Sequence, residues 1–180
     1  MTQLAQIAEE VGVNERTLRR AVNEGALRGH RPSPRVLDLP LVERRYVRRS
    51  WTLLSQLRKV LRTERNIRFA LLFGSAAAGA DTPSSDVDVL VDLRDPSLER
   101  LADLSAKLEA AVGRPVDMIR LEDAEADPSF LASVISEGRV LVDREDRWSQ
   151  LRRRAPGLRR RGVRRDAKRT RAALAGIDRL

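Results

Sequence analysis

Residues 67–73, IRFALLF, form an almost unbroken apolar run that ends abruptly at Gly74 and Ser75. Such a run predicts a buried strand, and the glycine after it lets the chain turn sharply and approach a ligand closely. If residues 75–78 begin a short helix, its free backbone N–H groups and the Ser75 hydroxyl suit a polyphosphate. Residues 79–85 are rich in Gly, Pro and Ser and predict a loop.

Carboxylates stand at a regular spacing in the next two apolar segments. Residues 86–92 predict a second strand, and because alternate residues of a strand share a face, Asp86 and Asp88 lie on one side. Two such carboxylates can hold Mg²⁺ or Mn²⁺, which takes further ligands from substrate phosphates.

Residues 116–119 predict a third apolar strand that carries one charge, Asp117. A charge buried in such a strand is costly unless a metal ion or a partner satisfies it. Beside the first two carboxylates, Asp117 could hold a second metal ion or take the proton from an attacking hydroxyl group. A Gly-Ser pair alone carries no signal, and an Asp-x-Asp is usually a solvated strand end. The combination at this spacing is far more specific.

Residues 66–142 resemble the minimal nucleotidyltransferases of the DNA polymerase beta superfamily, whose signature is Gly-Ser, ten residues, Asp-x-Asp and a third Asp. The resemblance implies a small mixed sheet with flanking helices and the transfer of a nucleoside monophosphate from an NTP, with ATP expected. It also implies that Gly74, Ser75 and Ser85 bind the nucleotide and that Asp86, Asp88 and Asp117 are the catalytic, metal-holding carboxylates. One position departs from the pattern, because Ala78 stands where relatives commonly have Arg.

Charge is divided sharply along the chain. The net charge of +9 is made up of +7 in residues 1–65, −9 in residues 66–146 and +11 in residues 147–180. An acidic middle suits a cation-dependent site, and basic flanks suit nucleic acid or an acidic protein. Cysteine is absent, which excludes disulfides and thiolate metal sites. With no apolar run of membrane-spanning length and no signal-peptide core, we expect a cytoplasmic protein without membrane contact.

Residues 1–40 predict a DNA-binding module of the helix-turn-helix type. A helix over residues 4–11, a turn at Gly12, an N-cap at Asn14 and a helix over residues 15–24 are its core. Residues 27–37 could form a small basic wing, and the segment resembles winged helix-turn-helix regulators in a generic way. The expected DNA-contacting residues are Arg16, Thr17, Arg19, Arg20, Asn23, Arg28 and Arg31. A helical hairpin that serves only as a structural cap is the alternative.

The other segments complete a mixed α/β chain with a mainly helical N-terminal module. Residues 41–65 predict a connecting helix, residues 97–112 a helix capped by Ser97, residues 127–137 a helix and residues 139–142 a strand. The expected domains are therefore 1–40, 41–65, 66–146 and an Arg-rich tail over 147–180. The basic C-terminal tail is expected to be helical, but Pro156, Gly157 and Gly162 should break any continuous helix. This leaves a partly disordered, solvated segment or a phosphate-backbone or acidic-partner clamp.

Three functions remain open from the sequence. The first is an antitoxin-like enzyme that modifies a hydroxyl group on a HEPN-type ribonuclease toxin and represses its own operon, as the resemblance implies. The second is a DNA-binding regulator, possible as a homodimer, whose nucleotidyltransferase domain does not turn over. The third is nucleotidyl transfer to a small molecule or to tRNA.

Overall fold

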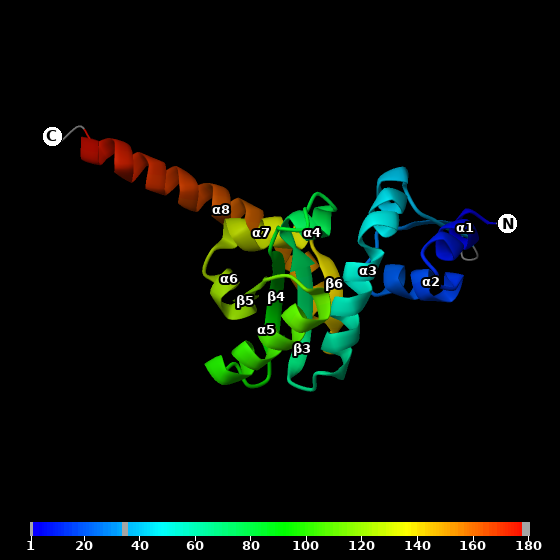
Figure 1. Cartoon of the computed structure of the whole chain (residues 1–180). Helices are drawn as coiled ribbons and strands as arrows, with labels where there is room; N and C mark the ends of the chain where they lie inside the picture. Colours follow the sequence, from blue (N-terminus) through cyan, green and yellow to red (C-terminus); the bar gives the residue numbers. More distant parts are fainter. Residues whose placement is uncertain (1, 34–35, 178–180) are drawn as a thin grey trace.

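The computed structural model describes residues 2–33 and 36–177, and it places a small sheet between an N-terminal helical module and a long C-terminal helix (Figure 1). In chain order the elements are α1 Gln3–Glu10, α2 Glu15–Asn23, β1 His30–Ser33, β2 Val36–Asp38, α3 Leu41–Thr63, β3 Ile67–Phe73, α4 Gly74–Ala78, β4 Val87–Leu93, α5 Leu98–Val112, β5 Val116–Arg120, α6 Leu121–Glu125, α7 Pro128–Glu137, β6 Arg139–Asp143 and α8 Arg147–Ile177.

The central sheet is mixed and has the strand order β5-β4-β3-β6. β3 runs antiparallel to both of its neighbours, whereas β4 and β5 are parallel. The register sets Phe73, the last residue of β3, opposite Asp88, and it sets Asp88 beside Asp117 of β5. The predicted strands at 67–73, 86–92, 116–119 and 139–142 are confirmed to within a residue or two at each end.

Alternating side chains divide the core between the two faces of this sheet. Val87, Val89 and Val91 of β4 belong to the cluster that includes buried residues of α3 and α5. Leu90 lies on the other face, in the cluster formed with α7 and α8. The alternation follows from the two-residue period of a strand and leaves both faces covered. Helices α3 and α5 thus cover one face, and α7 and α8 cover the other.

The N-terminal segment forms two short helices followed by a hairpin. The side chain of Asn14 accepts a hydrogen bond from the Thr17 amide at 2.9 Å, so the predicted N-cap of α2 is confirmed. Buried Leu18 anchors α2 in the core, while Val22 is only half-buried. β1 and β2 pair antiparallel where a wing was expected, and the residues 34–35 between them lie outside the described residues.

A fully buried ion pair joins this segment to the sheet. Arg139, the first residue of β6, donates to both carboxylate oxygens of Glu43 in α3, at 2.5 and 3.0 Å. Its guanidinium also donates to the carbonyl of Ala77 at 2.6 Å and to that of Ala26 at 3.3 Å, and it stacks 3.3 Å from the centre of the Tyr46 ring. One cation therefore connects α3, α4 and the N-terminal module.

Backbone groups of β6 make further hydrogen bonds to α3 and to the turn after α2. The Val140 amide donates to the Gly25 carbonyl at 3.0 Å, and Arg58 donates to the Val140 carbonyl at 3.1 Å. Arg58 is itself buried and paired with Glu24. Part of the outer edge of β6 is thereby closed by α3 and by the turn after α2, which satisfies groups that an open sheet edge would leave unpaired.

The C-terminal tail is helical as expected, but the predicted break at Pro156, Gly157 and Gly162 is absent from the described residues. α8 is continuous from Arg147 to Ile177, through Pro156, although proline removes one helical hydrogen bond. Packing of Leu151 and Leu158 against α7 and the sheet outweighs this cost. Gly162 is buried where α8 crosses α7, and a Cβ there would lie 3.1 Å from the Ser129 Cα, so the glycine allows close approach.

Smaller differences from the sequence predictions concern helix ends. Ser97 occupies the N-cap position of α5, but its side chain makes no capping hydrogen bond. Leu98 is 79% exposed, and Leu41 and Val42 at the start of α3 are exposed as well, because the first turn of each helix projects beyond the core. Helix α6 was not expected. No helix within residues 2–33 and 36–177 is long and apolar enough to cross a membrane.

Two glycines of α8 provide a matched test of this packing. No atom lies within 4 Å of a Cβ built at Gly157, whereas one built at Gly162 overlaps the Ser129 hydroxyl. We expect Gly157→Ala to raise the free energy of unfolding by about 0.5–1 kcal/mol through helix propensity. Gly162→Ala should lower it by about 1–3 kcal/mol through overpacking. Urea denaturation measures both, and equal effects would contradict the close approach of α8 to α7.

Candidate active site

The turn after β3 brings the backbone of Gly74 against a carboxylate. Gly74 has a φ of 68°, a left-handed conformation that favours glycine. A Cβ built at this position would overlap Oδ2 of Asp88, the residue opposite Phe73 in the sheet register. The absence of a side chain therefore serves two purposes here, since it permits the turn and leaves room for the Asp88 carboxylate.

The short helix α4 follows this turn directly and supports the predicted role of Gly74 and Ser75 geometrically. It begins at Gly74, and no side chain caps its N-terminus. Ser75 is half-buried at its first turn, and Ala76 and Ala77 are buried beneath it. Ala78, where relatives commonly carry Arg, is exposed. The beginning of α4 thus presents backbone N–H groups and one hydroxyl group beside Asp88.

The three predicted carboxylates gather at the same end of the sheet. Asp88 is half-buried in β4, and Asp86 is exposed just before this strand begins. Asp117 is the parallel neighbour of Asp88 on β5. Asp117 is exposed, because β5 is an edge strand, so the expectation of a costly buried charge at this position was wrong. The sheet register thus places Asp117 beside Asp88, but Asp117 is not buried.

Asp88 is the carboxylate of this group whose pKa is shifted by its surroundings. Burial raises the pKa of its carboxyl group above the ordinary value of 3.8, and the charges of Asp117 and Asp86 raise it further. A divalent cation bound at Asp88 would relieve the repulsion that Asp117 and Asp86 exert on it.

The described side chains nevertheless contain no group of three or more His, Cys, Asp or Glu residues placed to hold an ion by themselves. Mg²⁺ commonly binds through one or two carboxylates and takes other ligands from substrate phosphates. The residues present therefore fit an ion that arrives with a nucleotide.

The loop between α4 and β4 is held by residues that the sequence did not reveal. Arg114 donates to the Ser85 carbonyl at 2.7 and 3.0 Å and to the Asp81 carboxylate at 2.7 Å. The hydroxyl of Ser85, a predicted nucleotide ligand, is 2.9 Å from both the amide and the hydroxyl oxygen of Thr82. Ser85 thus shapes the loop that precedes Asp86, and no motif in the sequence identified Arg114 as its anchor.

The predicted DNA-contacting residues are mostly engaged within the chain. Arg19 pairs with Glu15 at 3.1 Å and Arg20 with Glu24 at 2.7 Å, while the Thr17 hydroxyl donates to Asn14 at 3.1 Å. The others are placed as follows: Arg31 donates to Asn23 and Arg28 to the Glu137 carbonyl, each at 2.5 Å, and Arg16 is exposed on α2. These contacts are at the surface, so a polyanion could displace them.

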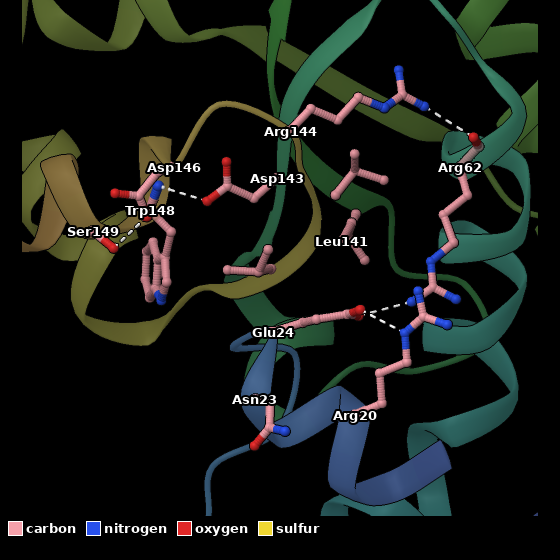
Figure 2. Close-up of a pocket in the computed structure, with 12 residues that line it drawn as sticks. Arg20, Asn23, Glu24, Arg62, Leu141, Asp143, Arg144, Asp146, Trp148 and Ser149 are labelled. Atoms are coloured by element: carbon pink, nitrogen blue, oxygen red, sulfur yellow. Dashed lines mark hydrogen bonds and ion pairs between the residues drawn. The ribbon is translucent and has the colours of Figure 1, made fainter. Parts of the chain in front are cut away.

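A cavity of about 680 Å³ lies away from the carboxylates, where α2, the end of α3, β6 and the start of α8 meet (Figure 2). Its wall carries both signs of charge, with Arg20, Arg62 and Arg144 opposed by Glu24, Asp143 and Asp146 (Figure 2). The Asp143 carboxylate accepts from the first amides of α8, and Arg144 donates to carbonyls at the end of α3. Much of this polar lining is therefore structural.

Comparison with known proteins assigns residues 55–147 to the model of the polymerase beta nucleotidyltransferase family. The protein adenylyltransferase MntA of Thermococcus cleftensis is 38% identical over 69 residues, which cover 38% of this chain and 70% of the relative. A relative from Methanocaldococcus jannaschii is 34% identical over 65 residues, covering 34% of this chain and 65% of that protein.

Among solved structures, a toxin-antitoxin crystal structure with AMP-PNP contains a chain with a TM-score of 0.51 and 21% identity. The match covers 71% of this chain and 98% of that one, and it shows a shared fold.

Gly74→Ala should lower the free energy of unfolding by more than the strain of its backbone angle alone would cause. Gly113 has the same φ of 68°, but no atom lies within 4 Å of a Cβ built there, so Gly113→Ala is the matched control. We expect the control to lose about 1 kcal/mol of unfolding free energy, from the backbone. Gly74→Ala should lose about 1–3 kcal/mol more, because it overlaps Asp88. Equal losses in urea denaturation would show that the contact is unimportant.

Asp88→Asn should stabilise the metal-free protein at neutral pH. Because the folded-state pKa of Asp88 is raised, its stabilising contribution is present below pH 3.8 and is lost as pH rises through the folded-state pKa. In EDTA, the variant should therefore exceed the wild type in unfolding free energy at pH 7.5, and the gap should narrow at pH 3.5. Asp103→Asn, at an exposed position of α5, should show no such gap. A destabilised variant at pH 7.5 would contradict the predicted repulsion.

Proposed function

The chain belongs to the polymerase beta nucleotidyltransferase family, and we propose that it transfers AMP from ATP to a hydroxyl group on a partner protein. Its fold and family make it a nucleotidyltransferase. The specific proposal is an antitoxin-like, Mg²⁺-dependent adenylyltransferase whose acceptor is a HEPN-type toxin. The observation that carries it is the meeting of the Gly74-Ser75 turn with Asp86, Asp88 and Asp117 at one end of the sheet.

The reaction is a displacement at the α-phosphorus of ATP. The acceptor oxygen forms a bond to that phosphorus, the bond to the oxygen that bridges to the β-phosphate breaks, and pyrophosphate leaves. The acceptor hydroxyl proton passes to a base, and we assign this role to Asp117, which is exposed and next to Asp88. When bound, Mg²⁺ supplies positive charge that offsets the charge on the phosphates. The residues that would hold it are Asp86 and Asp88.

Positioning is the main task of the remaining site residues. The free N–H groups at the start of α4 and the Ser75 hydroxyl would orient the phosphates of ATP. Arg139 fixes the Ala77 carbonyl from behind, and Arg114 fixes the loop ahead of Asp86. Both arginines act through other groups, so they are positioning residues. With this arrangement, binding places the reactants in line without large movement of the backbone.

A macromolecular acceptor is supported by the openness of the site. Asp86 and Asp117 are both exposed, so a hydroxyl group carried on another protein could approach them. The archaeal relative from Thermococcus cleftensis bears the name of a protein adenylyltransferase, which supports a protein acceptor and ATP as the donor. The HEPN-type identity of the partner follows from the family resemblance.

We also assign DNA binding and autoregulation to the N-terminal module, which we interpret as a winged helix-turn-helix. Support comes from the capped helix pair, from the antiparallel hairpin after it, and from exposed Arg16 on α2. Because helix-turn-helix proteins usually recognise two half-sites, we expect a homodimer on the operator. The residues assigned to DNA contact remain Arg16, Thr17, Arg19, Arg20, Asn23, Arg28 and Arg31.

The transfer reaction is tested with purified protein, Mg²⁺, ATP labelled at the α-phosphorus and the co-encoded partner protein. We expect label on the partner, and at least a ~100-fold slower reaction for Asp86→Ala with Asp88→Ala, because several kcal/mol of charge stabilisation would be lost. Omission of Mg²⁺ with EDTA should have the same effect as the double substitution.

The matched control is Asp95→Ala with Asp103→Ala, which removes two carboxylates from exposed positions outside the site. This variant should label the partner at the wild-type rate. Equal labelling by the wild type and the Asp86→Ala, Asp88→Ala variant would refute catalysis by these carboxylates. Label on tRNA or a small molecule alone would refute a protein acceptor.

A further inference from the structure

A second groove, of about 530 Å³, lies between the hairpin side of the N-terminal module and the first turns of α8. Three guanidinium groups line it, from Arg28, Arg152 and Arg159, and no carboxylate is among its lining residues. Its floor includes Trp148 and the apolar side chains of Leu27 and Ile135. The groove therefore differs from the cavity of Figure 2, whose arginines face an equal number of carboxylates.

The arginines of α8 fall into two groups by their partners. Arg154 pairs with Glu125 at 2.7 Å, and Arg165 donates to the Ala126 carbonyl at 2.6 Å, so both hold α8 against the α6–α7 turn. Among the described side chains, no carboxylate pairs with the exposed residues Arg152, Arg153, Arg159, Arg160, Arg161 and Arg164. Arg152 lies over the Trp148 ring at 5.9 Å from its centre. The second group is a row of positive charge without intramolecular neutralisation.

The groove is preformed, because both of its walls are fixed to the same body. Leu151 and Leu158 anchor α8 in the core beside α7. The wall formed by the segment between α2 and β1 is held by Arg28, which donates to the Glu137 carbonyl at the end of α7. A Cβ at Gly25 would lie 2.9 Å from the Trp148 indole nitrogen, so the turn after α2 packs directly on α8. Fixed charges bind a polyanion with little ordering cost.

We propose that this groove and the unpaired arginines of α8 form the surface that binds the phosphate backbone of double-stranded DNA. The inference rests on the proposed function for DNA as the partner, and it adds the C-terminal helix as the main source of phosphate contacts. Arginine suits this role, because its guanidinium is weakly hydrated and matches phosphate oxygens with two parallel hydrogen bonds. Most of the DNA-contacting residues assigned to α2 are already paired within the chain, which leaves α8 as the larger unpaired basic surface.

Spacing along α8 allows separate contacts. Arg152 and Arg159 are seven residues apart on one side of the helix, or about 10.5 Å along its axis at 1.5 Å per residue. Arg153, Arg160 and Arg164 are exposed and follow an adjacent side of the helix, at spacings of seven and four residues. Residues on these two sides would reach different phosphates of one duplex, so each should contribute to the salt dependence of binding.

The test is the binding of full-length protein to a fluorescent 30-base-pair duplex of random sequence, measured by anisotropy at several salt concentrations. We expect Arg152→Gln with Arg159→Gln to weaken binding at least ~10-fold at low salt. The slope of log affinity against log salt should become less steep by about 2, since each lost phosphate contact removes about 0.9. Glutamine keeps the helix propensity close to that of arginine.

Arg100→Gln with Lys107→Gln on α5 is the control, because it removes the same charge from the opposite face of the sheet. The control should keep the wild-type slope. An unchanged slope in the α8 variant, with wild-type DNA binding intact, would overturn the inference and leave α2 as the binding element. Failure of the wild-type protein to bind DNA would also overturn it, as would equally tight binding of an RNA duplex.

Nucleotidyl transfer to the partner protein is measured on the same variants. It should proceed at the wild-type rate in both, because neither pair of residues belongs to the turn at Gly74 or to the carboxylates Asp86, Asp88 and Asp117. A loss of transfer in the α8 variant would show that the substitutions damage the whole protein. Its weaker DNA binding would then count against the proposed DNA surface. Loss of transfer in the wild type concerns the proposed enzyme alone.

Discussion

The buried pair of Arg139 and Glu43 is the interaction on which the arrangement of the molecule depends. A buried ion pair is stable only when its hydrogen bonds are complete, and removal of one partner typically costs about 3–5 kcal/mol. Here the guanidinium also donates to the Ala77 and Ala26 carbonyls and lies against the Tyr46 ring. The same group therefore sets the position of α4, whose first turn meets Asp88, and the position of the N-terminal module. The turn at Gly74 and the N-terminal module therefore share one anchor.

At the candidate active site, two features lower the free energy of unfolding. Burial and two neighbouring charges raise the pKa of Asp88, so the metal-free fold carries an unfavourable carboxylate at neutral pH. Gly74 adds a left-handed backbone in contact with that carboxylate. Neither feature helps the chain to fold, and both bring the start of α4 against the Asp88 carboxylate. A divalent cation bound at these carboxylates would relieve the repulsion that raises the pKa of Asp88.

The sheet and the candidate site were largely predictable, because they depend on local patterns. The apolar run 67–73, the glycine after it and the alternation at Asp86 and Asp88 each reflect one strand and one turn. The exposure of Asp117 was not predictable, since it depends on the position of β5 at the sheet edge. The ion pair of Arg139 was not predicted, because its partner Glu43 is 96 residues away in the chain. Continuity of α8 through Pro156 likewise depends on contacts with α7.

Separation of charge makes the two proposed activities compatible in one small chain. The carboxylates of β4 and β5 repel a polyanion, whereas the arginines of α8 attract one, and screening at physiological salt limits each field to roughly 8 Å. The lining of the groove beside Arg152 and Arg159 includes none of Asp86, Asp88 and Asp117, so a duplex there would not occupy the candidate active site. Strand β6 connects the two surfaces. It begins at Arg139, which donates to the Ala77 carbonyl of α4, and it leads into α8. Any influence of bound DNA on nucleotide transfer would have to pass through the packing around this strand.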